Sequence, residues 1–240
     1  MFMEVTMGTN SIYEDGTYLS KHPTWHEEDS PWKADNIDRL LKRNSVHPLT
    51  VCEVGCGAGG ILENLATRYG DDVSFTGYEI SPGAFELCRK KTKGNLRYHH
   101  KSLFGDSAEF DVVMAIDVFE HVEDYIGFLR DLRKKGAYKV FHIPLELSVQ
   151  WVLRSTPLIK QRLAVGHIHH FTKETALATL KDTGYEVIDY FYTNTSEVPN
   201  LATWGWKARL LKVPRKILFL INQDLTVRIL GGFSLMVLAK

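Results

Sequence analysis

The chain has 240 residues, in which 29 lysine and arginine residues balance 29 aspartate and glutamate residues. Hydrophobic residues make up 44% of the chain, enough for a sizeable core, so global disorder is excluded. The zero net charge argues against a dedicated nucleic-acid binder, which needs a basic excess to neutralise phosphates. The length favours one domain, with an N-terminal lid segment over residues 1–33, a core over 34–195 and a basic helical insertion plus last strand over 196–240.

The cysteine content and the apolar runs indicate the cellular compartment in which the protein resides. Cys52, Cys56 and Cys88 are too few for a disulfide scaffold and form no CxxC pair. The first residues lack a basic stretch followed by an apolar one, so we expect no signal peptide. The apolar runs 217–221 and 235–239 fall far short of the ~20 residues that span a bilayer. These features predict a cytoplasmic protein.

Strand and helix patterns alternate along most of the chain. Strands are expected at 49–54, 73–79, 96–103, 110–116, 139–143, 185–192 and 233–239. Helices are expected from a cap at Asp35 or Asn36, after the glycines at 55–60, after Ser81-Pro82, and at 122–135, 147–164 (interrupted by Pro157) and 172–182. This alternation predicts an α/β fold with a doubly wound, parallel sheet.

A glycine-rich loop follows the first expected strand. It reads Gly55-Cys-Gly57-Ala-Gly59-Gly60 and fits both the GxGxxG pattern and an acidic-first pattern that begins at Glu53. Glycine lets the backbone approach a ligand without a Cβ clash. Glu79 closes the second strand about 20 residues later, where a carboxylate can accept both hydroxyls of a ribose. The combination predicts a nucleoside-containing cofactor.

The charge near the glycine-rich loop distinguishes between a cofactor with a pyrophosphate and one without. A pyrophosphate prefers a helix N-terminus without nearby negative charge, whereas Glu53 lies just before this loop. The acidic groups at strand ends, Glu53, Glu79 and Asp117, suit the amino group and the sulfonium of S-adenosylmethionine (SAM) better. An NAD(P)-dependent oxidoreductase remains the alternative, and a non-catalytic SAM-binding or membrane-associated scaffold is a third interpretation.

Four segments occur in an order that is similar to a known family. They are VCEVGCGAG at 51–59, YEISP at 78–82, FDVVMAIDVFEHVED at 110–124 and GHIHHFT at 166–172. Together they resemble motifs of the class I SAM-dependent methyltransferases, in particular the branch that methylates small molecules. The resemblance covers roughly residues 35–195. It implies a Rossmann-like, seven-stranded, mostly parallel sheet whose antiparallel last strand forms a hairpin with the sixth, with helical elements capping it at both termini.

The resemblance also implies roles for the matching residues. The methionine part of SAM would be lined by Glu53, Gly55, Gly57 and Gly59 and bordered by Asp117 and Val118. Glu79 would hold the ribose, and Ile80 would pack on the adenine. Many family members place an aspartate after the third strand for the adenine amino group; here Ser102 or a backbone carbonyl would have to accept that bond.

Histidines are the candidates for the chemistry. The methyl group of SAM is already activated, so a base is needed only when the acceptor still carries a proton, as a hydroxyl does. His121 is the candidate base, with a pKa that Asp117 would raise; a structural, helix-capping role is the alternative. The cluster His167, His169 and His170 is expected on a substrate-facing loop, and because no carboxylate or cysteine spacing supports a metal, none is expected.

Charge is unevenly distributed between the two ends. Residues 1–40 hold eight acidic and three basic residues, whereas 200–240 hold one acidic and seven basic residues. The N-terminal segment, with Tyr18, Trp25 and Trp32, is expected to fold over the cofactor and exclude water, or else only to fasten the N-terminus to the sheet. The basic segment 204–219 is interpreted first as an amphipathic helix that covers the sheet. A peripheral membrane contact or a cradle for an anionic substrate remains open.

The sequence therefore predicts a SAM-dependent methyltransferase for a small molecule, with oxygen favoured over nitrogen or carbon as the methyl acceptor. A nucleic-acid methyltransferase is disfavoured, because no Asn/Asp-Pro-Pro-aromatic tetrad follows the fourth strand. A sugar or another anionic metabolite is one open interpretation of the acceptor.

Overall fold

The computed structural model describes residues 13, 16–198 and 212–240. Within these residues one sheet has the strand order β3-β2-β1-β4-β5-β7-β6. The strands are β1 (Thr50–Val54), β2 (Ser74–Glu79), β3 (Leu96–His100), β4 (Phe110–Ile116), β5 (Gly136–Leu145), β6 (Val187–Asn194) and β7 (Phe233–Ala239). Strand β7 pairs antiparallel with β5 and with β6, and the other strand pairs of this sheet are parallel. The predicted fold, mostly parallel with an antiparallel last strand, is confirmed.

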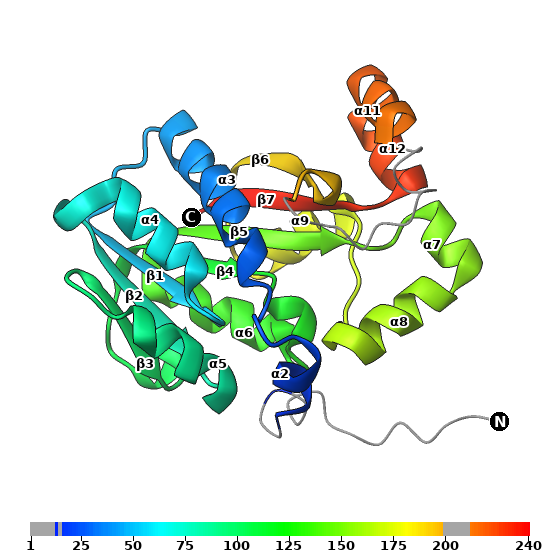
Figure 1. Ribbon diagram of the computed structural model, residues 1–240. Helices are drawn as coiled ribbons and strands as arrows, with labels where there is room; N and C mark the ends of the chain where they lie inside the picture. The colour runs from blue at the N-terminus through cyan, green and yellow to red at the C-terminus, as the bar shows by residue number, and fades with distance from the viewer. Residues whose placement is uncertain (1–12, 14–15, 199–211) are drawn as a thin grey trace.

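Helices cover both faces of the sheet (Figure 1). They are α2 (Thr17–Lys21), α3 (Ser30–Arg43), α4 (Gly60–Tyr69), α5 (Pro82–Cys88), α6 (Tyr125–Leu132), α7 (Val149–Arg154), α8 (Thr156–Val165), α9 (Lys173–Asp182), α11 (Lys212–Ile221) and α12 (Gln223–Leu230). Residues of α3, α4 and α5 join one core cluster, and those of α6, α9 and α12 join the other. Strand β4 serves both clusters, because Met114 faces one and Val113 faces the other.

The first long helix begins earlier than predicted. It starts at Ser30, with a proline in its first turn, and not at Asp35 or Asn36. Proline suits this place because the first helical amide groups have no partner within the helix. The extra turn carries Lys33 to the carboxyl ends of the strands.

Two further boundaries differ from the prediction. Strand β3 ends at His100, and a 3₁₀ turn over Leu103–Gly105 follows it. The break expected at Pro157 falls at Ser155, whose φ of 56° separates α7 from α8, and Pro157 lies in the first turn of α8. Pro157 suits the first turn of α8, because the first helical amide groups have no partner within the helix.

The basic C-terminal segment is only partly described. Residues 204–211 lie outside the described residues, whereas α11 and α12 precede β7. Val227 of α12 packs in the core, and Phe219 of α11 stacks on Phe233. Across the described ranges, no helix combines the length and apolar character needed to cross a membrane.

Candidate active site

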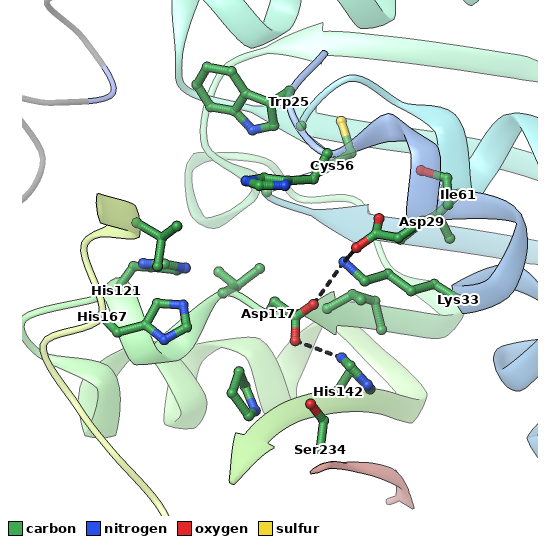
Figure 2. A pocket seen from close by; sticks show the side chains of 18 of the residues that line it. Trp25, Asp29, Lys33, Cys56, Ile61, Asp117, His121, His142, His167 and Ser234 are labelled. Carbon is green, nitrogen blue, oxygen red and sulfur yellow. Dashed lines mark hydrogen bonds and ion pairs between the residues drawn. The ribbon is translucent and has the colours of Figure 1, made fainter. Parts of the chain in front are cut away.

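A cavity of about 500 Å³ opens where the carboxyl ends of β1, β2, β4 and β5 meet the N-terminal segment. Figure 2 shows the side chains that surround it. Its volume lies within the range of small-molecule and cofactor sites, and its place at the strand ends is where open α/β sheets bind ligands. The predicted residues that line it are Glu53, Gly55, Gly57, Gly59, Glu79, Ile80, Asp117, Val118 and His121.

Two features require glycine in the loop after β1: a backbone with positive φ, and neighbouring side chains that leave no room for a Cβ atom. Gly55, Gly57 and Gly59 have φ values of 66°, 55° and 78°, a region that side chains disfavour. A Cβ at Gly57 would lie 2.7 Å from Cδ1 of Trp25, and one at Gly59 would lie 2.7 Å from the Tyr98 ring. The loop can therefore hold the backbone close to a ligand between β1 and the N-terminal segment.

Glu79 fastens this loop to the next helix. Its Oε2 accepts a hydrogen bond from the Gly57 amide at 2.8 Å, and its Oε1 accepts one from the Ser81 amide at 2.7 Å. Burial raises the pKa of this carboxyl. Each oxygen keeps a second lone pair, so the carboxylate can accept further bonds from a ligand in the cavity.

Glu53 is an unpaired carboxyl in the wall of the cavity. Its side chain is 1% exposed, and its Oε2 has no hydrogen-bond partner within the described residues. Burial raises its pKa well above the ordinary value. Burying a carboxyl oxygen without a hydrogen-bond partner costs free energy. The site therefore favours a ligand that brings a positive charge or a hydrogen-bond donor.

Asp117 is the centre of a charged network (Figure 2). Its Oδ2 lies 2.9 Å from Nζ of Lys33, and its Oδ1 lies 2.6 Å from Nδ1 of His142. Lys33 also pairs with Asp29 at 3.1 Å. Burial alone would raise the pKa of Asp117, but His142 and Lys33 hold it well below its usual range. Lys33 and its role are absent from the sequence-based prediction, because the helix that carries it begins earlier than the capping signals indicate.

Ser102 is not among the residues that line the cavity. Its exposed hydroxyl instead accepts a hydrogen bond from the Phe104 amide at 3.2 Å, at the start of the 3₁₀ turn. Because β3 ends at His100, the chain turns before Ser102 could follow the strand toward the cavity. Ile80, by contrast, is 56% exposed at the cavity wall, where it can pack on a flat ligand.

His121 lies at the other end of the cavity beside Tyr13. The Tyr13 hydroxyl donates to the Val165 carbonyl at 2.6 Å, so its oxygen accepts from Nδ1 of His121 at 2.9 Å. Burial and the neighbouring His167 lower the pKa of His121 to about 4. Asp117 raises the pKa of His121, as expected, but burial and His167 outweigh this effect, so the net shift is downward.

A carboxylate that the sequence did not single out organises the histidine cluster. Glu146, just after β5, accepts from Nδ1 of His167 at 2.7 Å and from Nδ1 of His170 at 2.5 Å. His169 bonds instead to the Val122 carbonyl at 2.9 Å. Of these three histidines, His167 lines the cavity, next to His121. The position of Glu146 at the carboxyl end of a parallel strand is the signal that could have identified it.

Aromatic side chains of the N-terminal segment close one side of the cavity. The ring centroids of Tyr13 and Tyr18 lie 4.9 Å apart, and those of Tyr18 and Trp25 lie 4.7 Å apart. Trp25, with a φ of 51°, and Trp32 also line the cavity. The N-terminal segment therefore forms part of the cavity wall, and its role as a lid stays a prediction.

Comparison with known families identifies the class of protein. A profile of the family described as "Methyltransferase domain" matches residues 25–190. The match spans more than half of the chain, so the chain belongs to the methyltransferase domain family. The predicted class, a SAM-dependent methyltransferase with a Rossmann-like fold, is confirmed, and the oxidoreductase alternative is not supported.

The relatives include enzymes named for ubiquinone biosynthesis. The mitochondrial ubiquinone biosynthesis O-methyltransferase of Schizosaccharomyces pombe is 36% identical over 102 residues, which cover 39% of this chain and 36% of that protein. The enzyme of the same name from Methylocella silvestris is 38% identical over 99 residues, 39% of this chain and 37% of that protein. The chain thus matches little more than a third of the length of these relatives.

Solved structures share the fold over more of the chain. Magnesium protoporphyrin IX methyltransferase from Synechocystis PCC 6803, solved with bound SAH, has a TM-score of 0.65 and 14% identity and covers 96% of this chain and 98% of its own. A cyclopropane synthase from Mycobacterium tuberculosis has a TM-score of 0.57 and 18% identity, with 80% and 78% coverage. At these identities the similarity establishes the fold.

Proposed function

We propose that the chain acts as one domain that transfers the methyl group of SAM to an oxygen atom of a small molecule. The observation that carries this proposal is Glu53, a buried carboxyl with an unpaired oxygen beside the glycine loop. Such a group suits a cationic ligand, whose charge stabilises the carboxylate, and offers no positive charge to the phosphates of NAD(P). The relatives named as O-methyltransferases support oxygen as the acceptor atom.

Different residues of the cavity would bind the different parts of SAM. Glu53 would take the amino group of the methionine part, and Lys33 would pair with its carboxylate. Gly55, Gly57 and Gly59 would let the backbone approach, next to Asp117 and Val118. Glu79 would accept the ribose hydroxyls through charge-assisted bonds, and Ile80 would pack on the adenine. Because Ser102 lies away from the cavity, the adenine amino group is left to a backbone carbonyl.

The remaining residues would serve the transfer itself. Tyr13, Tyr18 and Trp25 would exclude water, which favours displacement at a sulfonium. His121 is the proposed acceptor of the hydroxyl proton, because it lines the cavity and burial lowers its pKa, which favours the neutral imidazole. Orientation of the two reactants would supply most of the remaining acceleration, since the methyl group needs no covalent intermediate.

We further propose that the acceptor is lipophilic and is reached from a membrane surface. Helices α7, α8 and α11 expose large apolar side chains, with Leu153 and Leu220 at 80% and 77% exposure, and contain no acidic residue. Trp151 of α7 and Val165 of α8 line the cavity. A basic, apolar surface at the mouth of a binding cavity is suited to anionic lipid. A sugar or other anionic acceptor and the cytoplasmic location stay predictions.

Two measurements test the proposed activity. Isothermal titration of the chain with SAM and with NAD⁺ should give binding for SAM alone. A transfer assay with isotope-labelled SAM should then label hydroxyl-bearing, lipophilic acceptors such as long-chain phenols. Binding of NAD⁺ without SAM would overturn the cofactor, and transfer confined to amines would overturn oxygen as the acceptor.

A further inference from the structure

We infer that Glu120, His121 and His167 form a binding site for a divalent transition-metal cation at the acceptor end of the cavity. One potential ligand atom from each of the three side chains lies within 4.8 Å of the others. Glu120 and His121 come from a 3₁₀ turn over Phe119–His121, just after β4, and His167 comes from the loop before α9. Figure 2 shows His121 and His167 side by side at the edge of the cavity.

Glu120 provides the first independent indication of a ligand. Its side chain is 1% exposed, and neither carboxyl oxygen has a hydrogen-bond partner among the described residues. Buried polar atoms are almost always paired, and a carboxyl group with both oxygens unpaired costs several kcal/mol. A bound cation would satisfy both oxygens at once.

The two imidazoles are oriented as metal ligands usually are. Tyr13 accepts from Nδ1 of His121, and Nε2 of His121 lies 4.0 Å from Oε1 of Glu120. Glu146 accepts from Nδ1 of His167 at 2.7 Å, which leaves Nε2 of His167 as the second ring nitrogen. A histidine that binds a metal nearly always donates its other ring N–H to a carboxylate, a carbonyl or another oxygen.

The donor set selects the class of cation. Two imidazole nitrogens and one carboxylate match the three protein ligands of catalytic zinc sites, which keep one position open for water or substrate. Mg²⁺ and Ca²⁺ prefer sites made of oxygen atoms alone. Because His121 and His167 line the cavity, the open position would face the acceptor.

This inference rests on the proposed function and assigns the activation of the acceptor to the cation. A hydroxyl oxygen bound at the open position would release its proton to water more readily, because the cation lowers the pKa of the hydroxyl. The oxygen lone pair would then form the C–O bond while the C–S bond breaks, and the bonding pair would remain on the now neutral sulfur. With the cation bound, His121 acts as a ligand and the proton goes to water, so the inference keeps the proposed methyl transfer to oxygen and replaces only the role of His121 as the proton acceptor.

Titration of the chelator-treated full chain with Zn²⁺ tests the site directly. Wild type should bind one Zn²⁺ more tightly than Mg²⁺, and Co²⁺ should give visible d–d absorption bands that Zn²⁺ abolishes. Glu120→Gln and His167→Gln should each lower Zn²⁺ affinity by about a hundredfold or more. Glu146→Gln, which changes a positioning residue, should lower it by ~10–100-fold.

His169→Gln is the matched control, because the His169 side chain bonds to the Val122 carbonyl and is not one of the three potential ligands. It should keep wild-type Zn²⁺ affinity. Titration with SAM separates this inference from the proposed function, since the Glu120 and His167 variants should still bind SAM. Should the wild type bind no Zn²⁺, or should both ligand variants bind it as tightly as the wild type, the metal site is wrong while SAM binding stands.

Discussion

Gly57 is the residue at which backbone conformation and available space both constrain the cavity. Its φ is 55°, and an added Cβ would lie 2.7 Å from Cδ1 of Trp25. We expect Gly57→Ala to abolish measurable SAM binding, because the methyl group displaces either the loop or the lid. Stability should fall by about 1–2 kcal/mol, the usual cost of a side chain in the left-handed region. Calorimetric titration and urea unfolding measure the two effects.

Gly70→Ala is the control for that variant. Gly70 has a φ of 65°, but nothing lies within 4 Å of its Cβ position. Its ψ of −155° also places it in a region that side chains disfavour, so the control carries backbone strain without a steric contact and should keep normal SAM affinity. Normal SAM binding by Gly57→Ala would show that the loop does not approach the cofactor.

Glu79 offers a second test at the residue scale. An amide in place of the carboxylate has one acceptor atom in place of two, so Glu79→Gln cannot serve the Gly57 amide, the Ser81 amide and two hydroxyls together. We expect SAM affinity to fall tenfold or more, because hydrogen bonds to a charged group contribute ~1.5–3 kcal/mol.

A 2′-deoxy analogue of SAM separates the ribose contact from loosening of the loop. Wild type should prefer SAM to the analogue, and Glu79→Gln should lose most of this preference. Equal binding of the two ligands by the wild type would contradict the ribose contact.

Among the elements, helix α3 contributes charge to the site as well as core packing. Lys33 pairs with Asp117 and Asp29, and all three side chains are largely buried. Lys33→Met should lower the free energy of unfolding at pH 7 by about 2–3 kcal/mol. The loss is less than the full cost of a buried unpaired charge, because His142 still faces Asp117.

The same pair predicts a pH dependence. The pKa of Asp117 is lower in the folded chain than in the unfolded one, so its stabilisation is present above pH ~3.9 and declines as the pH falls below that value. The stability difference between wild type and Lys33→Met should therefore shrink in acid. Lys42→Met, which removes an exposed pair with Asp38 on the same helix, should cost less than about 1 kcal/mol. A pH-independent difference would contradict the role of Asp117.

The elements also explain what sequence could predict. The strands at 110–116 and 233–239 have the predicted bounds, because continuous apolar runs identify strands buried on both faces. The glycines, Glu79 and Asp117 follow from their places at strand ends, where the fold fixes their position. Lys33 and Glu146 are different, because their approach to the cavity depends on how a helix start and a strand end pack in three dimensions. Glu120 could not be identified as buried and unpaired without that packing.

At the scale of the whole molecule, one end carries an unusual amount of exposed apolar surface. Helices α7, α8, α11 and α12 form a contiguous group at that end (Figure 1), where Leu153, Ile159, Leu220 and Ile221 are exposed. We expect the chain to sediment with vesicles that contain phosphatidylglycerol, and less with pure phosphatidylcholine, because its basic side chains attract anionic lipid.

Paired substitutions on this surface test that binding. Leu153→Ser with Leu220→Ser should reduce binding to the vesicles, and the SAM affinity should remain normal. Leu49→Ser is the control, since Leu49 is exposed at the start of β1, away from these helices. Equal sedimentation of the double variant and the control would exclude the surface as a lipid contact.

The strand order has a consequence for how the chain is made. Strand β7 lies between β5 and β6 in the sheet and pairs with both. It is made last, because a long connection separates the end of β6 at Asn194 from the start of β7 at Phe233. During synthesis, β5 and β6 therefore emerge from the ribosome before the strand that joins them, with open edges that can pair with other chains. At ~5–20 residues per second, the about 45 residues up to the end of β7 take roughly 2–9 s to add. In that interval chaperone binding and mispairing compete with the correct closure of the sheet.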